Sequence, residues 1–78
     1  MSIQNSIFAP ANPTIAVGGI VTWTNRDVDP HNVIAEDGHF HSDLLTQGQV
    51  FSRQFDRAGA FTYVCTLHGG MTGVVTVR

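Results

Sequence analysis

The segment Tyr63-Val-Cys-Thr-Leu-His-Gly-Gly-Met71 carries three metal-binding side chains at equal spacing. A thiol (Cys65), an imidazole (His68) and a thioether (Met71) follow one another three residues apart, directly after a run of β-forming residues. One loop can wrap this spacing around a single ion, and the two glycines before Met71 permit the sharp turn that this requires. A second imidazole, His31, lies far upstream. The segment therefore predicts a metal site at the end of a strand.

The rest of the chain has the composition of a small β protein. Of its 78 residues, 22 are Val, Ile or Thr, three are Leu, one is Glu and none is Lys, a balance that favours strands over helices. Turn residues recur about every ten positions, and the runs between them predict seven strands, over 2–8, 14–17, 20–25, 32–36, 49–55, 60–65 and 73–78. This pattern is typical of a β-sandwich or small barrel. We expect a single domain, residues 1–78, with 39–47 as a loop or one helical turn.

Alternation assigns faces to several of these predicted strands. Trp23 is expected in the core, and Phe51 and Phe55 share a face with Arg53. A guanidinium is an unusual companion for two phenyl rings, so we expect Arg53 to reach water near a strand end. Tyr63, two residues before the cysteine, is expected to make a tyrosine-corner hydrogen bond.

Charge and cysteine content exclude several classes of protein. The net charge is -2 and the four arginines are spread singly, which excludes binding to nucleic acid by phosphate neutralisation. No apolar run is long enough to span a membrane, and the first residues have no basic or apolar segment, so no signal peptide is expected in this chain. A single cysteine cannot form an internal disulfide, so Cys65 needs another role.

The upstream histidine completes a candidate ligand set. His31 lies at the start of the predicted strand 32–36, and Cys65 lies at the end of the predicted strand 60–65. In a Greek-key sandwich, these two strand ends can meet at one pole. Two imidazoles and a thiolate, with a weak axial thioether, describe a blue-copper electron-transfer site. We therefore expect His31, Cys65, His68 and Met71 to bind one copper ion (Cu2+/Cu+). Zinc is the chemical competitor for such a site, although Met is a poor zinc ligand.

The combined pattern resembles the small cupredoxins, the group of plastocyanin, pseudoazurin and amicyanin. The resemblance rests on the Cys-x2-His-x2-Met motif after an aromatic-rich strand, and on the segments 21–25, 30–32 and 73–77. The two-residue gap between His68 and Met71 is most similar to amicyanin. The resemblance implies an all-β, cupredoxin-like Greek-key β-sandwich with bound copper, which carries one electron at a time between redox partners.

The resemblance also implies roles for individual residues. His31 is expected to be buried and to bind through Nδ1. Asn32 is expected to tie the two ligand loops together, with its side chain reaching Thr66 and its backbone N–H donating to the Cys65 sulfur, because such outer contacts orient metal ligands. His68 is expected at the solvent edge, where it passes the electron.

Partner and location follow from the same resemblance. Redox proteins, an electron donor and an acceptor, are expected to dock on the uncharged pole around His68. The expected surface consists of Pro30, Leu67, Gly69, Gly70 and Met71. A small patch of this kind suits transient electron-transfer encounters. We expect a monomer in an exported setting, periplasmic or extracellular, where a lone thiol would be protected by copper.

Two other functions are compatible with the sequence. One is a copper carrier or store without redox shuttling, and the other is a metal-free β-sandwich interaction domain. An enzyme is not expected, since there is no Ser-His-Asp set and no open coordination position for a substrate. His39 and His41 could hold a second metal from one side of an extended segment, but a polar loop is the favoured interpretation.

Overall fold

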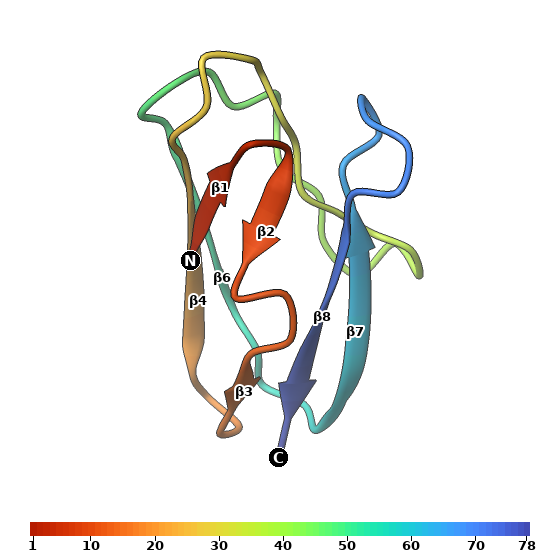
Figure 1. Ribbon diagram of the computed structural model, residues 1–78. Coiled ribbons are helices and arrows are strands. Elements are labelled where there is room, and N and C mark those ends of the chain that lie inside the picture. The colour runs from red at the N-terminus through yellow and green to blue at the C-terminus, as the bar shows by residue number, and fades with distance from the viewer.

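The chain folds as two four-stranded β-sheets packed face to face, and the computed structural model describes all residues from 1 to 78 (Figure 1). The first sheet has the order β2-β1-β4-β6, comprising β1 (Ser2–Gln4), β2 (Ile7–Ala9), β4 (Ile20–Asn25) and β6 (Val50–Gln54). The second has the order β3-β8-β7-β5, comprising β3 (Thr14–Ile15), β5 (Ile34–Ala35), β7 (Gly59–Val64) and β8 (Thr72–Val77). The predicted all-β sandwich is confirmed.

No element of the structure is a helix of the length and apolarity needed to cross a membrane. The predicted loop over 39–47 is confirmed as a loop without a helical turn. It is tied to the neighbouring chain by two isolated antiparallel bridges, His31 with Leu45 and Ile34 with His41.

The prediction of one strand over residues 2–8 is wrong, because the chain turns back within it. β1 pairs antiparallel with β2, and Gln4 lies opposite Ile7. The two residues between them, Asn5 and Ser6, have φ values of 55° and 58°. Two consecutive left-handed residues form the tight hairpin turn whose twist matches that of the flanking strands. The other six predicted strands exist, and three of them, β3, β5 and β6, are shorter than expected.

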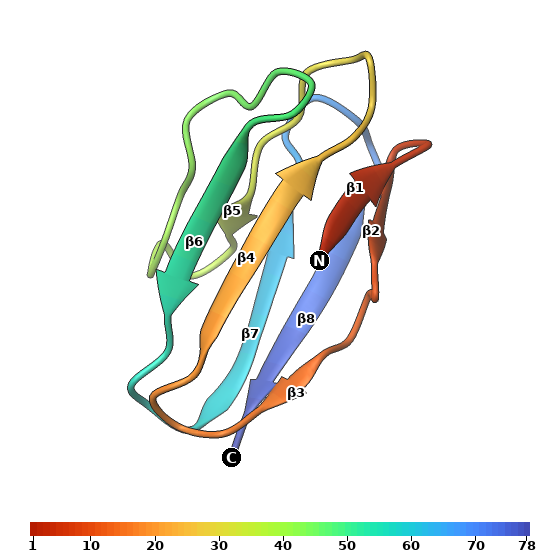
Figure 2. The same cartoon turned by 90° about the vertical axis from the view of Figure 1, so that its left-hand side faces the viewer.

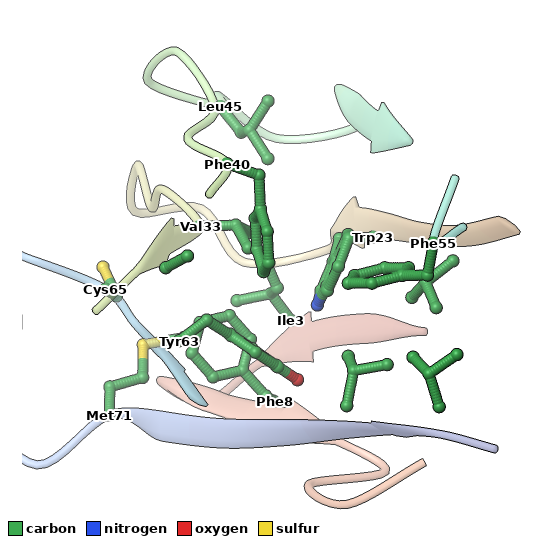
Figure 3. Close-up of a cluster of buried hydrophobic side chains, with 14 residues drawn as sticks. Ile3, Phe8, Trp23, Val33, Phe40, Leu45, Phe55, Tyr63, Cys65 and Met71 are labelled. Carbon is green, nitrogen blue, oxygen red and sulfur yellow. The ribbon is translucent and has the colours of Figure 1, made fainter. Parts of the chain in front are cut away.

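Aromatic rings fill the space between the two sheets (Figure 3). Trp23 is fully buried, and its ring centroid lies 5.3 Å from that of Tyr63, 5.6 Å from Phe51 and 5.9 Å from Phe40. Phe8 meets Tyr63 edge to face at 4.7 Å. Such pairs add about 0.5–1.5 kcal/mol each beyond the burial of their surface. The core therefore provides a rigid frame for the loops at its ends.

The expected tyrosine-corner hydrogen bond is absent. The Tyr63 hydroxyl is buried without a hydrogen-bond partner, as is the Trp23 indole N–H. The phenol instead lies over Gly73, its cross-strand neighbour in β8, where a side chain would occupy the same space. Burial raises the pKa of Tyr63 above its usual value of 10.0, so the hydroxyl stays neutral.

Three loops gather at one end of the sandwich. Figures 1 and 2 show the segment 26–32, the segment 42–48 and the β7–β8 loop 65–71 at the same pole. The β1–β2 turn points to this pole as well. Residues far apart in the sequence, including all four candidate metal ligands, are thereby brought to one end of the molecule.

Candidate metal centre

Cys65 and Met71 close the base of the β7–β8 loop. Cys65 follows the last residue of β7 and Met71 precedes the first residue of β8. The Cys65 backbone N–H donates to the Met71 carbonyl at 3.0 Å, so the two residues continue the antiparallel pairing of the hairpin. Both side chains are buried, with 3% and 4% exposure, and Figure 3 shows them at the same end of the core. The strand ends thus fix both sulfur-bearing residues.

His31 reaches this pole from the other side of the sandwich. Its backbone is held on both sides, since His31 N–H donates to Leu45 at 3.0 Å and Leu45 N–H donates back at 2.7 Å. Its ring is fully buried, and Nδ1 lies 3.7 Å from the Cys65 Sγ. The predicted convergence of these two residues, 34 positions apart, is present in the structure.

His68 lies beside His31 at the surface of the pole. The two ring centroids are 4.7 Å apart with the planes inclined by 46°, and His68 is half-buried. No three of the His, Cys, Asp and Glu side chains stand close enough together to hold an ion at once. His31 is thus the residue that lies close to both Cys65 and His68, and the loop that carries His68 contains Gly69 and Gly70, which permit a range of backbone conformations.

The spacing between His31 and Cys65 fits shared coordination of one ion. With metal–sulfur and metal–nitrogen bonds of the usual lengths, two ligands at tetrahedral to trigonal angles lie roughly 3.6–3.8 Å apart. The observed Nδ1–Sγ distance of 3.7 Å falls in this range. Imidazole, thiolate and thioether donors together suit copper better than zinc, which rarely takes a thioether.

Comparison with known proteins supports the same chemistry. The sequence profile of copper binding proteins of the plastocyanin/azurin family matches residues 2–78. The chain belongs to this family. Members of the family's plastocyanin and amicyanin branches are electron carriers rather than enzymes, and the predicted cupredoxin resemblance is confirmed.

Individual relatives cover most of the chain. It is 34% identical to plastocyanin of Scenedesmus fuscus over 92% of the chain and 87% of that protein. It is 37% identical to amicyanin-alpha of Methylorubrum extorquens over 100% of the chain and 70% of the relative. It spans 63% of an amicyanin of Paracoccus versutus, to which it is 34% identical.

Two solved structures share the architecture. A reduced amicyanin variant has a TM-score of 0.91 at 28% identity, over 100% of this chain and 81% of that one. A purple cupredoxin from Nitrosopumilus maritimus has a TM-score of 0.84 at 38% identity, over 90% of this chain and 80% of that one.

In this family member, Asn32 and Thr66 join the two ligand-bearing loops. The Asn32 amide Nδ2 donates to the Thr66 hydroxyl at 2.8 Å, and the Thr66 backbone N–H donates to Asn32 Oδ1 at 2.9 Å. The predicted side-chain contact is therefore confirmed. The expected hydrogen bond from the Asn32 backbone N–H to the Cys65 sulfur is not formed. The reciprocal pair holds the residue after His31 against the residue after Cys65.

Asp27 contacts a candidate ligand, and the sequence analysis did not single it out. Its carboxylate lies 2.8 Å from His31 Nε2, and it also accepts the backbone N–H groups of Asn5 at 2.7 Å and Ser6 at 2.9 Å. These backbone bonds, assisted by His31, lower the pKa of the carboxyl below its usual value. A carboxylate accepts the Nε2 proton, and Nδ1, the atom facing Cys65, is then left free to bind a metal.

Asn25 organises the loop that carries Asp27 and His31. Its buried amide donates to the carbonyls of Asp29 at 3.0 Å and Leu45 at 2.7 Å, and its carbonyl accepts the Asp27 backbone N–H at 2.9 Å. Three bonds from one fully buried side chain leave this loop few alternative conformations.

The structure places His39 and His41, the histidines considered for a second metal, on an exposed loop. Both are exposed on either side of buried Phe40, as alternation requires. His39 Nδ1 is bonded to Asp37 at 2.9 Å. This exposed setting favours the polar-loop interpretation of the two histidines.

Proposed function

We propose that this chain carries one electron at a time between redox proteins by means of one copper ion held by His31, Cys65, His68 and Met71. The observation that carries the proposal is the buried pairing of His31 Nδ1 with Cys65 Sγ at 3.7 Å, in a member of a copper-binding family. Copper, when bound, supplies the one-electron couple.

The protein contributes donors that stay in place when the charge at the site changes. His31 is fixed by two backbone hydrogen bonds and by Asp27. Cys65 and Met71 are fixed by the hairpin that they close. Since these groups are buried and already positioned, little rearrangement accompanies gain or loss of an electron. Preorganisation of this kind is what rapid electron transfer between proteins requires.

His68 supplies the exposed edge of the site. Around it lie Leu67, with 50% exposure, and the exposed residues Pro30, Gly69 and Gly70. Val28, 81% exposed, is a further apolar side chain in the segment 26–32 at the same pole. The expectation that Met71 contributes to the surface is wrong, because closing the hairpin base places its side chain inside. We propose that redox partners dock on this patch in short-lived encounters that bury little area.

Burial of the donors argues against a copper carrier or store. Carriers exchange metal through accessible sulfur ligands, whereas Cys65 is 3% and His31 is 0% exposed. A metal-free interaction domain would have no need of an imidazole and a thiol facing each other in a closed site. Both alternatives therefore explain less of the structure than electron transfer does.

The proposal also includes the oligomeric state and the cellular location of the protein. We expect residues 1–78 to act as one domain and as a monomer, in a periplasmic or extracellular location. An oxidising setting supports a free thiol only when the thiol is protected, and Cys65 is both free and buried.

The four histidines provide an internally controlled test. Cu(II) is titrated into the wild-type chain and into variants in which each histidine is replaced singly by Gln, with visible absorption as the readout. We expect intense colour at one equivalent for wild type, His39→Gln and His41→Gln, and loss or strong change of colour for His31→Gln and His68→Gln. A colourless wild type, or equal effects of all four changes, would contradict the ligand assignment.

A further inference from the structure

A second concave site lies on the flank of the sandwich, away from the ligand pole. A cavity of about 290 Å³ opens between the two sheets. Its walls are formed by His39, Phe40, Arg53, Gln54, Phe55, Asp56, Arg57 and Phe61. None of these residues is a candidate copper ligand. Phe61 precedes Cys65 by four residues of extended chain, so this wall of the cavity lies about 13 Å along β7 from Cys65.

The cavity exists because one edge strand is too short to close the sandwich. β5 and β6 are the edge strands on this side. β5 pairs only with Tyr63 and Val64 at the end of β7, and the chain then turns back, with Gly38 N–H donating to Ala35. Figure 2 shows the lower part of β7 without a neighbour on this side. The first half of β7 therefore faces an opening rather than another strand.

The floor of the cavity is aromatic. The centroid of Phe55 lies 5.4 Å from that of Phe40 and 5.4 Å from that of Phe61. His39 meets Phe61 edge to face at 5.7 Å. Phe40 and Phe55 are buried, whereas Phe61 is only partly covered. A flat ring entering the cavity would pack against Phe61, the ring that is open to it, with the buried rings of Phe40 and Phe55 behind.

The rim of the cavity carries two arginines without protein partners. Arg53 lies opposite Val21, a core residue, so it projects from the inner face of β6 at the open edge. Arg57 follows in the β6–β7 turn. Neither guanidinium forms an ion pair, because the two ion pairs of the chain join histidines to aspartates. Asp56 is the one carboxylate in the wall, so two positive charges face a single negative one.

We propose that this cavity binds a small aromatic carboxylate, with the ring on the phenylalanine floor and the carboxylate on Arg53 and Arg57. Guanidinium groups recognise carboxylates through paired N–H donors. A volume near the lower limit for small-molecule sites suits a single ring with a short acidic arm. The competing explanation is that Arg53 only protects an edge strand from pairing with another chain, and that role needs neither Arg57 nor the aromatic floor.

Phenylacetate is the probe for this proposal. It is titrated into the 15N-labelled full chain while amide shifts are followed by NMR. We expect saturable shifts at Phe61 and at its neighbours in the cavity wall, with little change at Cys65. Because the candidate ligands take no part, the result is independent of copper binding. Benzyl alcohol, which lacks the charge, and acetate, which lacks the ring, are the matched ligands and should bind more weakly.

Charge-neutral variants complete the test. Arg53→Gln and Arg57→Gln should each weaken phenylacetate binding roughly two- to fivefold, the range for an exposed ion pair. Arg26→Gln removes the same charge at the pole of the candidate metal ligands, away from the cavity, and should leave the affinity unchanged. The proposal is overturned if phenylacetate produces no saturable shifts in the wall. It is also overturned if benzyl alcohol binds as well, or if Arg26→Gln weakens binding as much as the rim changes do.

Discussion

The contact between Tyr63 and Gly73 makes the β7–β8 hairpin intolerant of a single added methyl group. A Cβ at position 73 would lie 2.5 Å from Tyr63 Cζ and 3.0 Å from the Ala11 carbonyl oxygen. Tyr63 is fully buried, so its ring cannot swing into water. Overpacking costs about 1–3 kcal/mol in general. Since both obstacles here are rigid, we expect Gly73→Ala to lower the free energy of unfolding by about 3 kcal/mol.

Thermal unfolding followed by circular dichroism measures this effect directly. At about 4–8 °C per kcal/mol for a domain of this size, Tm should fall by roughly 12–24 °C. Gly69→Ala, in the loop of the same hairpin, is the matched control. A Cβ there has no atom within 4 Å and the backbone is not left-handed, so its effect should stay within about 0.5 kcal/mol.

A double-mutant cycle identifies the ring as the cause. In a Tyr63→Leu background the obstructing phenol is gone, and Gly73→Ala should cost at least about 1 kcal/mol less than in the wild type. The reasoning is refuted if Gly73→Ala is as mild as Gly69→Ala, or if its cost is the same in both backgrounds.

Three further predictions concern the proposed copper site. Asp27→Asn removes the carboxylate that makes His31 a stronger donor, so the reduction potential measured by voltammetry should rise; an unchanged potential would show that Asp27 does not act through His31. Met71→Gln replaces a soft sulfur by a harder oxygen that favours Cu(II) and should lower the potential, and the same value as wild type would exclude Met71 as a ligand. His68→Gly should leave a gap in the copper-loaded chain that added imidazole fills, restoring the visible spectrum; no spectral response to imidazole would mean that His68 is misassigned.

Local patterns predicted the sandwich, and its expected Greek-key arrangement predicted the approach of distant ligands. Alternation placed Trp23 in the core, where it is fully buried. The spacing of Cys65 and Met71 predicted a loop after a strand, and both close a hairpin base. The convergence of His31 with Cys65 followed from strand order rather than from sequence proximity, and their donor atoms do face each other.

The turn at Asn5 and Ser6 and the contact between Asp27 and His31 were not predicted from the sequence, because both depend on contacts between distant segments. The turn at Asn5 and Ser6 contains no glycine, and its left-handed backbone is stabilised by Asp27, more than 20 positions away. Asn5 is the only local signal for such a turn, since asparagine adopts left-handed backbone more readily than most residues, and Ser6 adds none. Asp27 and His31 do stand at i and i+4, but this spacing brings side chains together by itself only in a helix. Here the buried Asn25 shapes the loop that brings them together.

The open edge beside Arg53 is another feature that local sequence patterns did not predict. Alternation correctly placed it on the inner face of its strand, but the shortness of β5, which leaves that face open, was not visible in the sequence. The run 32–36 was predicted as a full strand, whereas only Ile34 and Ala35 pair as one. As expected, Arg53 is exposed near a strand end, next to the last residue of β6, and the open flank beside it also gives the guanidinium access to water.

The central claim is that side chains from two distant segments bind one copper ion. X-ray absorption at the copper edge of the loaded protein tests it most directly, because the spectrum reports the atoms bound to the metal. The account predicts one tightly bound sulfur and two imidazole nitrogens, with the sulfur signal lost in Cys65→Ser. A first shell of nitrogen and oxygen only in the wild type would contradict it.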